Sequence, residues 1–277
     1  MEQFASGWKR HYYGKGDVVA YRLNRGSQNE VFGASVLMLV HGDAFWPTYT
    51  EGDNAGLVAT DSMKNFIQRE TLNFTGADLL SYCRFLGEKF LAKYPQAEGV
   101  QVSAREIPYA PLSGRVGFTP GGPERAIARV EIGRSGVVET VSGIHGFKLL
   151  RLGGSAFHGF VRDEYTTLPE MADRPLHMWL DVEWRYVGTG AVDSDGETVA
   201  AARARVREVF ESFESGSIQQ AIYQMGTALL AALPAIAEVA LEAQNRTWDA
   251  VAERGVDVSV FTDPRPAYGC LGLRLRR

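Results

Sequence analysis

The 277-residue chain has only two cysteines, Cys83 and Cys270, and they lie far apart in the sequence. Neither belongs to a C-x-x-C pair, which excludes a zinc ribbon and a thioredoxin-type redox motif. A secreted protein of this size would often carry more cysteines, so the composition favours a reducing compartment, the cytoplasm. Cys83 falls on the apolar face of an expected helix and is predicted to be a core residue.

Long apolar runs and a strong excess of one charge are also missing. No apolar stretch reaches the ~18 residues that would indicate a membrane span, and the N-terminal sequence lacks the apolar segment of a secretory signal. Lysine and arginine total 29 against 33 aspartates and glutamates, so the formal net charge is −4. Such mild, scattered charge gives no electrostatic footprint for nucleic acid. We therefore expect a cytoplasmic protein without membrane or nucleic-acid partners.

Generic catalytic motifs are absent as well. The sequence has no G-x-G-x-x-G after an expected strand and no G-x-x-x-x-G-K-[ST] phosphate loop. It also lacks the G-x-S-x-G elbow of serine hydrolases. The five histidines show no H-E-x-x-H pattern and no i, i+4 pairing, so no metal site is expected from them. These patterns alone predict no function.

What the sequence does have is an ordinary globular composition, 45% apolar and 22% charged, together with clear strand patterns. In the first half, residues 17–24 and 30–43 are rich in Val, Tyr, Phe and Leu and predict two strands joined by a turn. Two further strands are expected at about 99–107 and 125–133, the latter from its alternation of side chains.

Two helices are expected between these pairs of strands. Thr60 and Asp61 are predicted to cap a helix that ends near Leu72. Thr75 is predicted to cap a second helix, which Pro95 ends. The apolar residues of this second helix recur at spacings of three and four and therefore share one face: Leu79, Leu80, Cys83, Leu86, Phe90 and Tyr94.

The second half repeats the same order of elements. Strands, helices and strands are expected in turn, at about 137–152, 176–187, 197–213, 217–233, 237–245, 256–261 and 268–275. Strands joined by short turns pair antiparallel, and neighbouring helices group on one face of a sheet. We therefore predict an α+β fold of two tandem repeats, residues 10–135 and 136–277. The stretches 108–123 and 188–195 are the longest turn-rich loops.

Longer strings in the sequence carry a family resemblance. They are Y-G-K-G-D-V at 13–18, Y-T-E-G-D-N at 49–54, V-A-T-D-S-M-K-N at 58–65 and S-A-F-H-G-F-V-R-D-E-Y-T-T-L-P-E at 155–170. Together they resemble the urate oxidase (uricase) family closely, in order and over nearly the whole chain. The resemblance implies the tunnelling fold (T-fold), in which tandem antiparallel sheets carry paired helices on one face. It also implies a homotetramer that encloses a channel and has its sites at subunit interfaces.

The resemblance implies a set of residues that bind the substrate. Phe157 looks like the aromatic on which a flat purine stacks, and Arg174 looks like the guanidinium that grips one edge of it. Ile218 and Gln219 look like the backbone and amide groups that grip the other edge. Each residue taken alone also has an ordinary structural explanation, as a core, surface or helix-start residue. Their joint occurrence in the family's order favours the functional interpretation.

Further residues are implied to handle protons and dioxygen. Thr60 and Asp61 look like the pair that reaches the substrate from the neighbouring subunit. Lys15 looks like the lysine that hydrogen-bonds Thr60 and helps to remove a proton. Asn245 looks like the amide that holds dioxygen over the ring.

The sequence departs from the family at one of these positions. After Asn245 the family carries a basic residue and then a histidine that belongs to its proton relay, and here Thr247 occupies the histidine position. A histidine titrates near neutrality and a threonine hydroxyl does not. Thr247 can pass a proton along a hydrogen-bond chain but cannot store one, so the chain is expected to be a divergent member of the family.

These observations lead to an enzyme hypothesis. The chain is expected to oxidise a planar purine with dioxygen and without a metal, flavin or other cofactor, converting urate to 5-hydroxyisourate and hydrogen peroxide. One alternative is an enzyme repurposed for another purine-like or fused-ring heterocycle, in specialised metabolism. Two others are a zinc-dependent ring-processing relative, which would need a Cys/His cluster, and a ligand-binding protein that has lost turnover.

Overall fold

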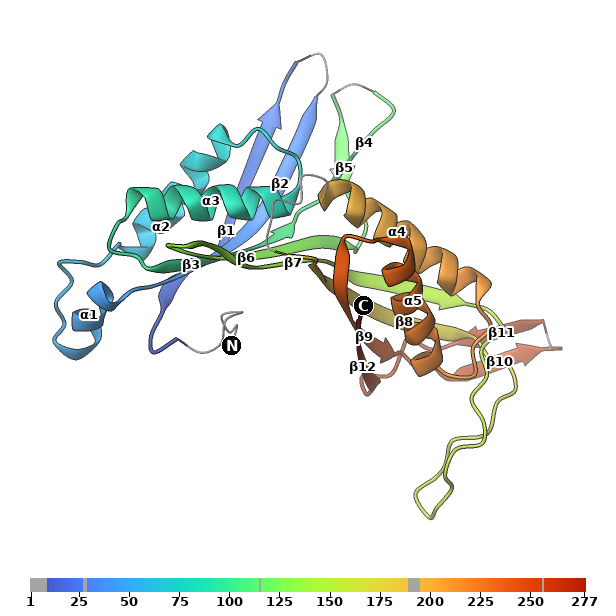
Figure 1. The fold of residues 1–277 in the computed structure, drawn as a ribbon. Helices are drawn as coiled ribbons and strands as arrows, with labels where there is room; N and C mark the ends of the chain where they lie inside the picture. The colour runs from blue at the N-terminus through green and yellow to red at the C-terminus, as the bar shows by residue number, and fades with distance from the viewer. Residues whose placement is uncertain (1–8, 27–28, 115, 189–194, 256) are drawn as a thin grey trace. The chain divides into compact units, whose positions relative to one another are not determined.

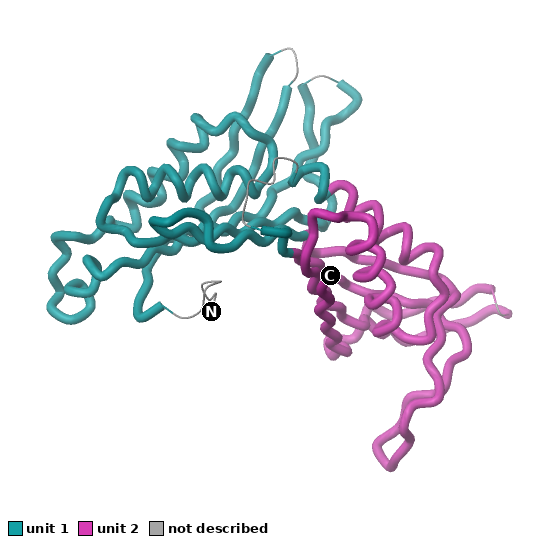
Figure 2. The backbone as a smooth tube through the Cα atoms, in the orientation of Figure 1, with its two compact units in different colours: residues 1–143, 185–199 teal, residues 144–184, 200–277 magenta. Residues whose placement is uncertain are grey.

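The computed structural model describes residues 9–26, 29–114, 116–188, 195–255 and 257–277. The chain divides into two compact units, shown in two colours in Figure 2. Unit 1 comprises residues 1–143 and 185–199, and unit 2 comprises residues 144–184 and 200–277. None of the described helices is long and apolar enough to cross a membrane.

Unit 1 is built on antiparallel strands with helices on one face (Figure 1). Its main strands are hydrogen-bonded in the order β1-β2-β3-β6. Their bounds are β1 Tyr13–Asn24, β2 Glu30–His41, β3 Gly99–Glu106 and β6 Arg125–Gly133. Helix α2 (Thr60–Glu70) packs against β1, and helix α3 (Leu79–Lys93) packs against β3 and β6. The apolar stripe predicted for α3 is buried from Leu79 to Phe90, Cys83 included, whereas its last member, Tyr94, follows the end of the helix and is half-buried.

An extra residue interrupts the pairing of β1 with β2. Lys15 is opposite Met38, but the next paired residue, Val18, is opposite Val36, so three steps along β1 match two along β2. Asp17, inside this bulge, has a φ of 51°. In an unbroken strand, alternation would place Lys15 and Val18 on opposite faces. The bulge instead places both of them on the face of the buried Met38 and Val36, which is the face that the helices cover.

The helix caps of unit 1 differ from the prediction. Helix α2 begins at Thr60 after Ala59, and no side chain caps it, so Thr60 and Asp61 belong to the first turn of the helix. Helix α3 is capped by Asp78 rather than Thr75, since the Asp78 carboxylate accepts a hydrogen bond from the Ser81 amide. Both predictions placed the helix start within a few residues but named the wrong cap. In α2 the predicted residues already belong to the helix, and before α3 two capping residue types, Thr75 and Asp78, lie close together.

Unit 2 repeats the arrangement, with strands in the order β7-β8-β9-β12 and two helices on one face (Figure 1). The bounds are β7 Gly136–Arg151, β8 Leu176–Tyr186, β9 Ile236–Asn245, β12 Gly269–Arg276, α4 Asp195–Ser212 and α5 Ile218–Ala232. Strands β7 and β8 and helix α4 contribute residues to both units. Along β8, every second residue from Leu176 to Tyr186 is buried and those between are half-buried. This is the period of a strand with one face against a core.

The order strand-strand-helix-helix-strand-strand, twice, is therefore confirmed. Strand β11 (Val258–Phe261) lies within the strand predicted at 256–261. The structure adds short elements that the sequence analysis missed: η1 Asp43–Phe45, α1 Trp46–Thr50, η2 Thr71–Asn73, β4 Tyr109–Pro111, β5 Phe118–Pro120 and β10 Ala250–Arg254. Strands β4 and β5 form a small hairpin inside the predicted loop 108–123. Such elements are too short to show a hydrophobic period. The predicted loop 188–195 lies largely outside the described residues.

Candidate active site

The candidate residues of unit 1 gather where β1 meets the start of α2. Asp61 is exposed, and its carboxylate accepts hydrogen bonds from Lys64 and, at 3.0 Å, from the Asn65 amide. The hydrogen bond from Lys64 lowers the pKa of Asp61 most, and the nearby charge of Lys15 lowers it further. Lys15 is thus close enough to Asp61 for the two charges to attract each other. Among the described residues, Lys15 and Thr60 have no hydrogen bond between them.

A tyrosine holds these two segments together. The Tyr13 hydroxyl, two residues before Lys15, accepts a hydrogen bond from the Val58 amide at 3.0 Å, two residues before Thr60. Burial raises the pKa of Tyr13 to about 12, so the hydroxyl stays protonated at neutral pH. The Tyr13 ring also packs edge-on against Phe45. The predicted lysine and threonine are therefore attached to a rigid core contact rather than to mobile ends.

In unit 2, Phe157 and Arg174 come together from the two arms of one long loop. Phe157 pairs with Met171 through two backbone hydrogen bonds of 2.8 and 2.9 Å, and the Arg174 amide donates to the Ser155 carbonyl at 2.9 Å. These bonds bring the Arg174 guanidinium over the Phe157 ring, 5.6 Å from its centroid. The two residues predicted to stack on and grip a flat ring are therefore neighbours.

The same loop is joined to the start of α5. Ser155 and Ser215 form a parallel bridge, in which the Ala156 amide donates to the Ser215 carbonyl at 2.8 Å. Two residues later Ser217 caps α5 by accepting a hydrogen bond from the Gln220 amide. The first helical residues are Ile218, which is buried, and Gln219, which is exposed. Their backbone N–H groups precede the first intrahelical bonds and remain available as donors.

The burial and the hydrogen bonding of the Arg174 guanidinium suit it to bind an anion. It is half-buried, and burial alone lowers its pKa from the usual range. Its Nε has no hydrogen-bond partner among the described residues. Burying a guanidinium without a carboxylate partner costs free energy, and a ligand that accepts its hydrogen bonds would offset that cost. A planar anionic edge, with two adjacent acceptors, would satisfy it.

Asn245 and Thr247 lie at the end of β9. Asn245 is paired with Gly269 of β12, and the Thr247 carbonyl accepts a hydrogen bond from the Arg265 amide at 2.9 Å. Both residues are half-buried. Within the described parts of the chain, no hydrogen bond or ring contact joins either of them to Phe157 or Arg174.

Sequence reasoning missed His177, the one histidine that the fold brings beside this segment. Its carbonyl accepts from the Arg246 amide at 2.9 Å, and its ring is 5.3 Å from that of Trp248. Trp179 Nε1 donates to His177 Nε2 at 3.3 Å. Burial lowers the pKa of His177, and the charges of Lys148 and Arg246 lower it further, which favours the neutral ring. His177 and Trp179 are two positions apart in β8, so the strand period could have predicted that they share one face.

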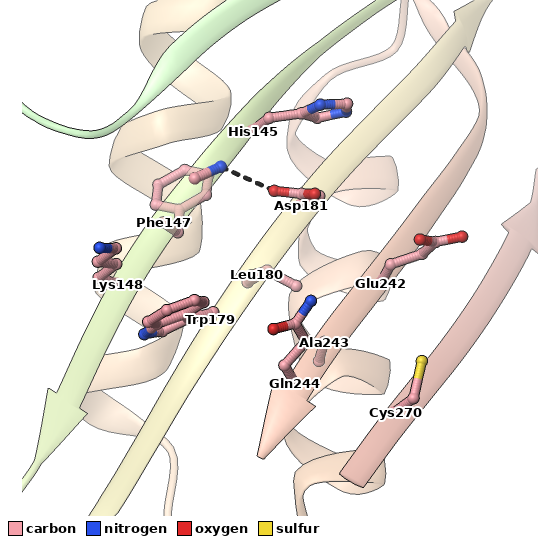
Figure 3. A pocket seen from close by; sticks show the side chains of 11 residues that line it. His145, Phe147, Lys148, Trp179, Leu180, Asp181, Glu242, Ala243, Gln244 and Cys270 are labelled. Atoms are coloured by element: carbon pink, nitrogen blue, oxygen red, sulfur yellow. Dashed lines mark hydrogen bonds between the residues drawn. The ribbon is translucent and has the colours of Figure 1, made fainter. Parts of the chain in front are cut away.

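A cavity of about 360 Å³ opens on the strands β7, β8, β9 and β12 of unit 2 (Figure 3). Charged and polar side chains line it, including His145, Lys148, Asp181, Glu242 and Gln244. None of the nine predicted site residues is among its lining residues. Across the part of the chain that the structure describes, no three or more His, Cys, Asp or Glu side chains are placed to hold a metal ion.

Known proteins resemble the chain in sequence and structure. A family model described as uricase matches residues 140–267. A uricase from Haloferax volcanii is 35% identical over 93% of this chain and 95% of its own length. The uric acid degradation bifunctional protein PucL of Bacillus subtilis is 35% identical over 93% of this chain, but the chain spans only 59% of that relative's length.

A solved structure agrees with these matches. The crystal structure of a uricase from Bacillus fastidious has a TM-score of 0.87 and 34% identity, and the match covers 97% of this chain and 94% of that one. The predicted α+β tunnelling fold and the predicted resemblance are therefore confirmed. The chain belongs to the uricase family.

Proposed function

We propose that the chain is a cofactor-independent urate oxidase, which converts urate, dioxygen and water to 5-hydroxyisourate and hydrogen peroxide. The observation that carries the proposal is the grouping of Phe157, Arg174 and the start of α5 by backbone hydrogen bonds. Urate is flat, anionic and rimmed by amide-like edges. The aromatic face of Phe157 suits its ring. The guanidinium of Arg174, whose Nε has no hydrogen-bond partner among the described residues, suits an anionic edge.

Ile218 and Gln219 complete the grip on the opposite edge. A backbone N–H at a helix start donates to a carbonyl or anionic oxygen, and the Gln219 amide can both donate and accept toward a urea-like group. Substrate bound on three sides is held in one orientation, which lowers the entropic part of the barrier. Asp61 of the neighbouring subunit would contribute a further polar contact in the proposed assembly.

The redox step needs no electron carrier from the protein. The deprotonated urate loses two electrons and dioxygen gains them, and water then adds its hydroxyl at the oxidised ring carbon while the protons pass to peroxide. In this proposal Asn245 holds dioxygen over the ring. Lys15 and Thr60 remove the proton, and Thr247 passes protons along a hydrogen-bond chain. General acid–base assistance of this kind contributes typically 10²–10⁴-fold.

The proposed site joins residues of two chains. Lys15, Thr60 and Asp61 belong to unit 1, whereas the substrate-gripping residues belong to unit 2. The resemblance implies that Thr60 and Asp61 reach the substrate from the neighbouring subunit of a homotetramer, and we propose this assembly for the present chain. The small number of cysteines supports a cytoplasmic location.

Oxygen uptake by the metal-free protein with urate tests the proposed activity, with urate absorbance and peroxide followed in parallel. Stoichiometric uptake with peroxide release is expected. Tight urate binding without uptake would overturn urate as substrate, and uptake with a different purine-like ring alone would reassign it.

A further inference from the structure

Arg246 lies between Asn245, which is proposed to hold dioxygen, and Thr247. Its half-buried guanidinium is held by two aromatic rings and one hydrogen bond. Its Cζ lies 3.8 Å from the centroid of the Trp179 ring and 4.1 Å from that of Tyr268. A terminal nitrogen of the guanidinium also donates to the Gln244 side-chain oxygen. A planar guanidinium between two aromatic faces is held by stacking and by cation–π attraction, which a lysine ammonium cannot reproduce in the same geometry.

The backbone and the next side chain are fixed on the same strand. The Arg246 amide donates to the His177 carbonyl of β8 at 2.9 Å. The Trp248 ring packs 5.3 Å from His177 and stacks 4.9 Å from Phe261 of β11 at an interplanar angle of 21°. Arg246 and Trp248, two residues apart just beyond the end of β9, therefore both contact side chains of β8.

Alternation then decides what happens to the residues between them. In extended chain, successive side chains point to opposite sides. Asn245 is the last residue of β9, and alternation there places it on the side opposite Gln244. Thr247 lies between two side chains that both contact β8, which leaves its backbone little freedom to rotate. The Thr247 carbonyl is held in addition by the Arg265 amide.

An ion pair does not explain Arg246. Among the described residues no carboxylate forms a salt bridge with it, and its Nε has no hydrogen-bond partner. Lys148 lies over the same Trp179 ring at 4.6 Å, so the cluster holds two cations on one indole. Neutralisation of charge therefore does not account for the position of Arg246, and its contacts with the aromatic rings do.

We infer that Arg246 is a positioning residue, which fixes Asn245 and Thr247 toward the reacting dioxygen through its stack between Trp179 and Tyr268. The inference rests on the proposed function, since it assigns Asn245 and Thr247 to the oxygen step. Arg246 itself does not contact urate, so its loss should affect the reaction of dioxygen and leave urate binding intact.

The test compares Arg246→Met and Arg246→Lys with a matched control, Arg274→Met. Arg274 is an exposed arginine of β12 that pairs with Glu238 and lies away from the 245–248 segment. We expect Arg246→Met to lower kcat/KM for dioxygen about 10–100-fold, because misplacing reacting groups by about 1 Å costs of that order. Urate affinity, measured without oxygen, should change less than about threefold. Arg246→Lys should rescue only part of the loss, and the control should match the wild type.

Unchanged kcat and unchanged KM for dioxygen in a folded Arg246→Met variant would overturn the inference. An equal loss of urate affinity and turnover would also overturn it, because that result indicates a structural defect of the whole site. If Arg246→Met fails to fold, Tyr268→Leu removes one wall of the stack at a half-exposed position and should show the same split, to a smaller extent.

Hydrogen exchange separates this inference from the proposed function. The Arg246 amide is bonded to the His177 carbonyl, so exchange over residues 245–249 should accelerate in Arg246→Met and not in Arg274→Met. If the wild type does not consume oxygen with urate, the proposed function fails, and unchanged exchange would then reject the positioning role independently.

Discussion

Two arginines beside neighbouring phenylalanines show how differently the same residue type can be used. Arg174 lies 5.6 Å from the Phe157 ring and Arg162 lies 5.7 Å from the Phe160 ring, and the two rings stack on each other at 5.0 Å. Arg174 is half-buried with an unpartnered Nε, whereas Arg162 is exposed and donates weakly to a loop carbonyl. Arg174 has lost part of its contact with water, and a bound ligand would replace those hydrogen bonds. Arg162 remains in contact with water and gains less from a ligand.

Arg174→Gln should therefore weaken urate binding about 10–100-fold, because hydrogen bonds to a charged group contribute about 1.5–3 kcal/mol. Arg162→Gln removes a cation from the adjacent ring and should leave the affinity unchanged. Equilibrium binding of urate under anaerobic conditions measures both. Equal losses in the two variants would show that general positive charge, and not the Arg174 fork, attracts the substrate.

Some site residues could be grouped from the sequence, and the orientation of others could not. Phe157, Arg174 and Ile218 were predicted as one group, and the structure joins them through the Ser155 and Ser215 bridge. The side on which Lys15 lies could not be predicted, because alternation alone would place it on the face opposite Val18. Tertiary pairing, which a single sequence does not show, introduced the bulge.

Among the elements, helix α5 carries the clearest link between stability and the site. Its cap, Ser217, immediately precedes Ile218 and Gln219, so the cap fixes the direction of the N–H groups proposed to hold urate. Helix α3 is capped in the same way by Asp78, in unit 1, and carries none of the predicted site residues.

Ser217→Ala and Asp78→Ala should each lower the free energy of unfolding by about 1 kcal/mol, the usual value of an N-cap hydrogen bond. Only Ser217→Ala should also raise KM for urate. Urea unfolding and steady-state kinetics on the same preparations distinguish the two effects. A rise in KM in both variants would indicate that stability alone limits binding.

Strands β7, β8 and β9 carry a pH-sensitive contact. Burial lowers the pKa of His145, but the hydrogen bond to Glu183 at 3.0 Å and the charges of Asp181 and Glu242 outweigh it, so the pKa is raised above its usual value. A group whose pKa is higher in the folded state stabilises the fold below its unfolded value, near 6.5. That contribution is lost as the pH rises through the raised pKa.

The urea midpoint of the wild type should therefore fall as the pH rises above about 6.5, by more than in His145→Gln. His158, an exposed histidine in the 155–170 string, offers a matched control, and His158→Gln should follow the wild type. Parallel curves for all three proteins would remove His145 as the source of the dependence.

Across the whole molecule, the repeated order of strands and helices was predictable because each half shows the periods of two and of three to four residues. The short strands β4, β5 and β10 were not predictable from such periods, whereas β11 was expected within residues 256–261. The contacts of Arg246 with Trp179 and Tyr268 were equally hidden, since they join residues of three separate strands and loops.

The proposed sharing of one site between two chains predicts complementation. Thr60→Ala and Arg174→Gln, each assayed at a urate concentration at which it alone is strongly impaired, should recover activity when they are co-expressed, because mixed assemblies contain sites with both residues intact. Random pairing should restore about a quarter of the sites. Phe157→Ala co-expressed with Arg174→Gln alters two residues of unit 2 and should recover nothing. No recovery in the first mixture would show that the site is built within one chain.

The extra residue in β1 gives the strand a place where a one-residue deletion should spare the orientation of Lys15. Its ammonium lies on the side of α2 because Gly16 and Asp17 together occupy the space of one residue opposite β2. Deleting Gly16 would leave Lys15 two positions before Val18, and residues two positions apart in a regular strand share one face. Lys15 would therefore still lie on the side of Thr60 and Asp61. Homologous segments that differ here by one residue in length would present the lysine alike, so a gap at this point of an alignment would not indicate a lost function.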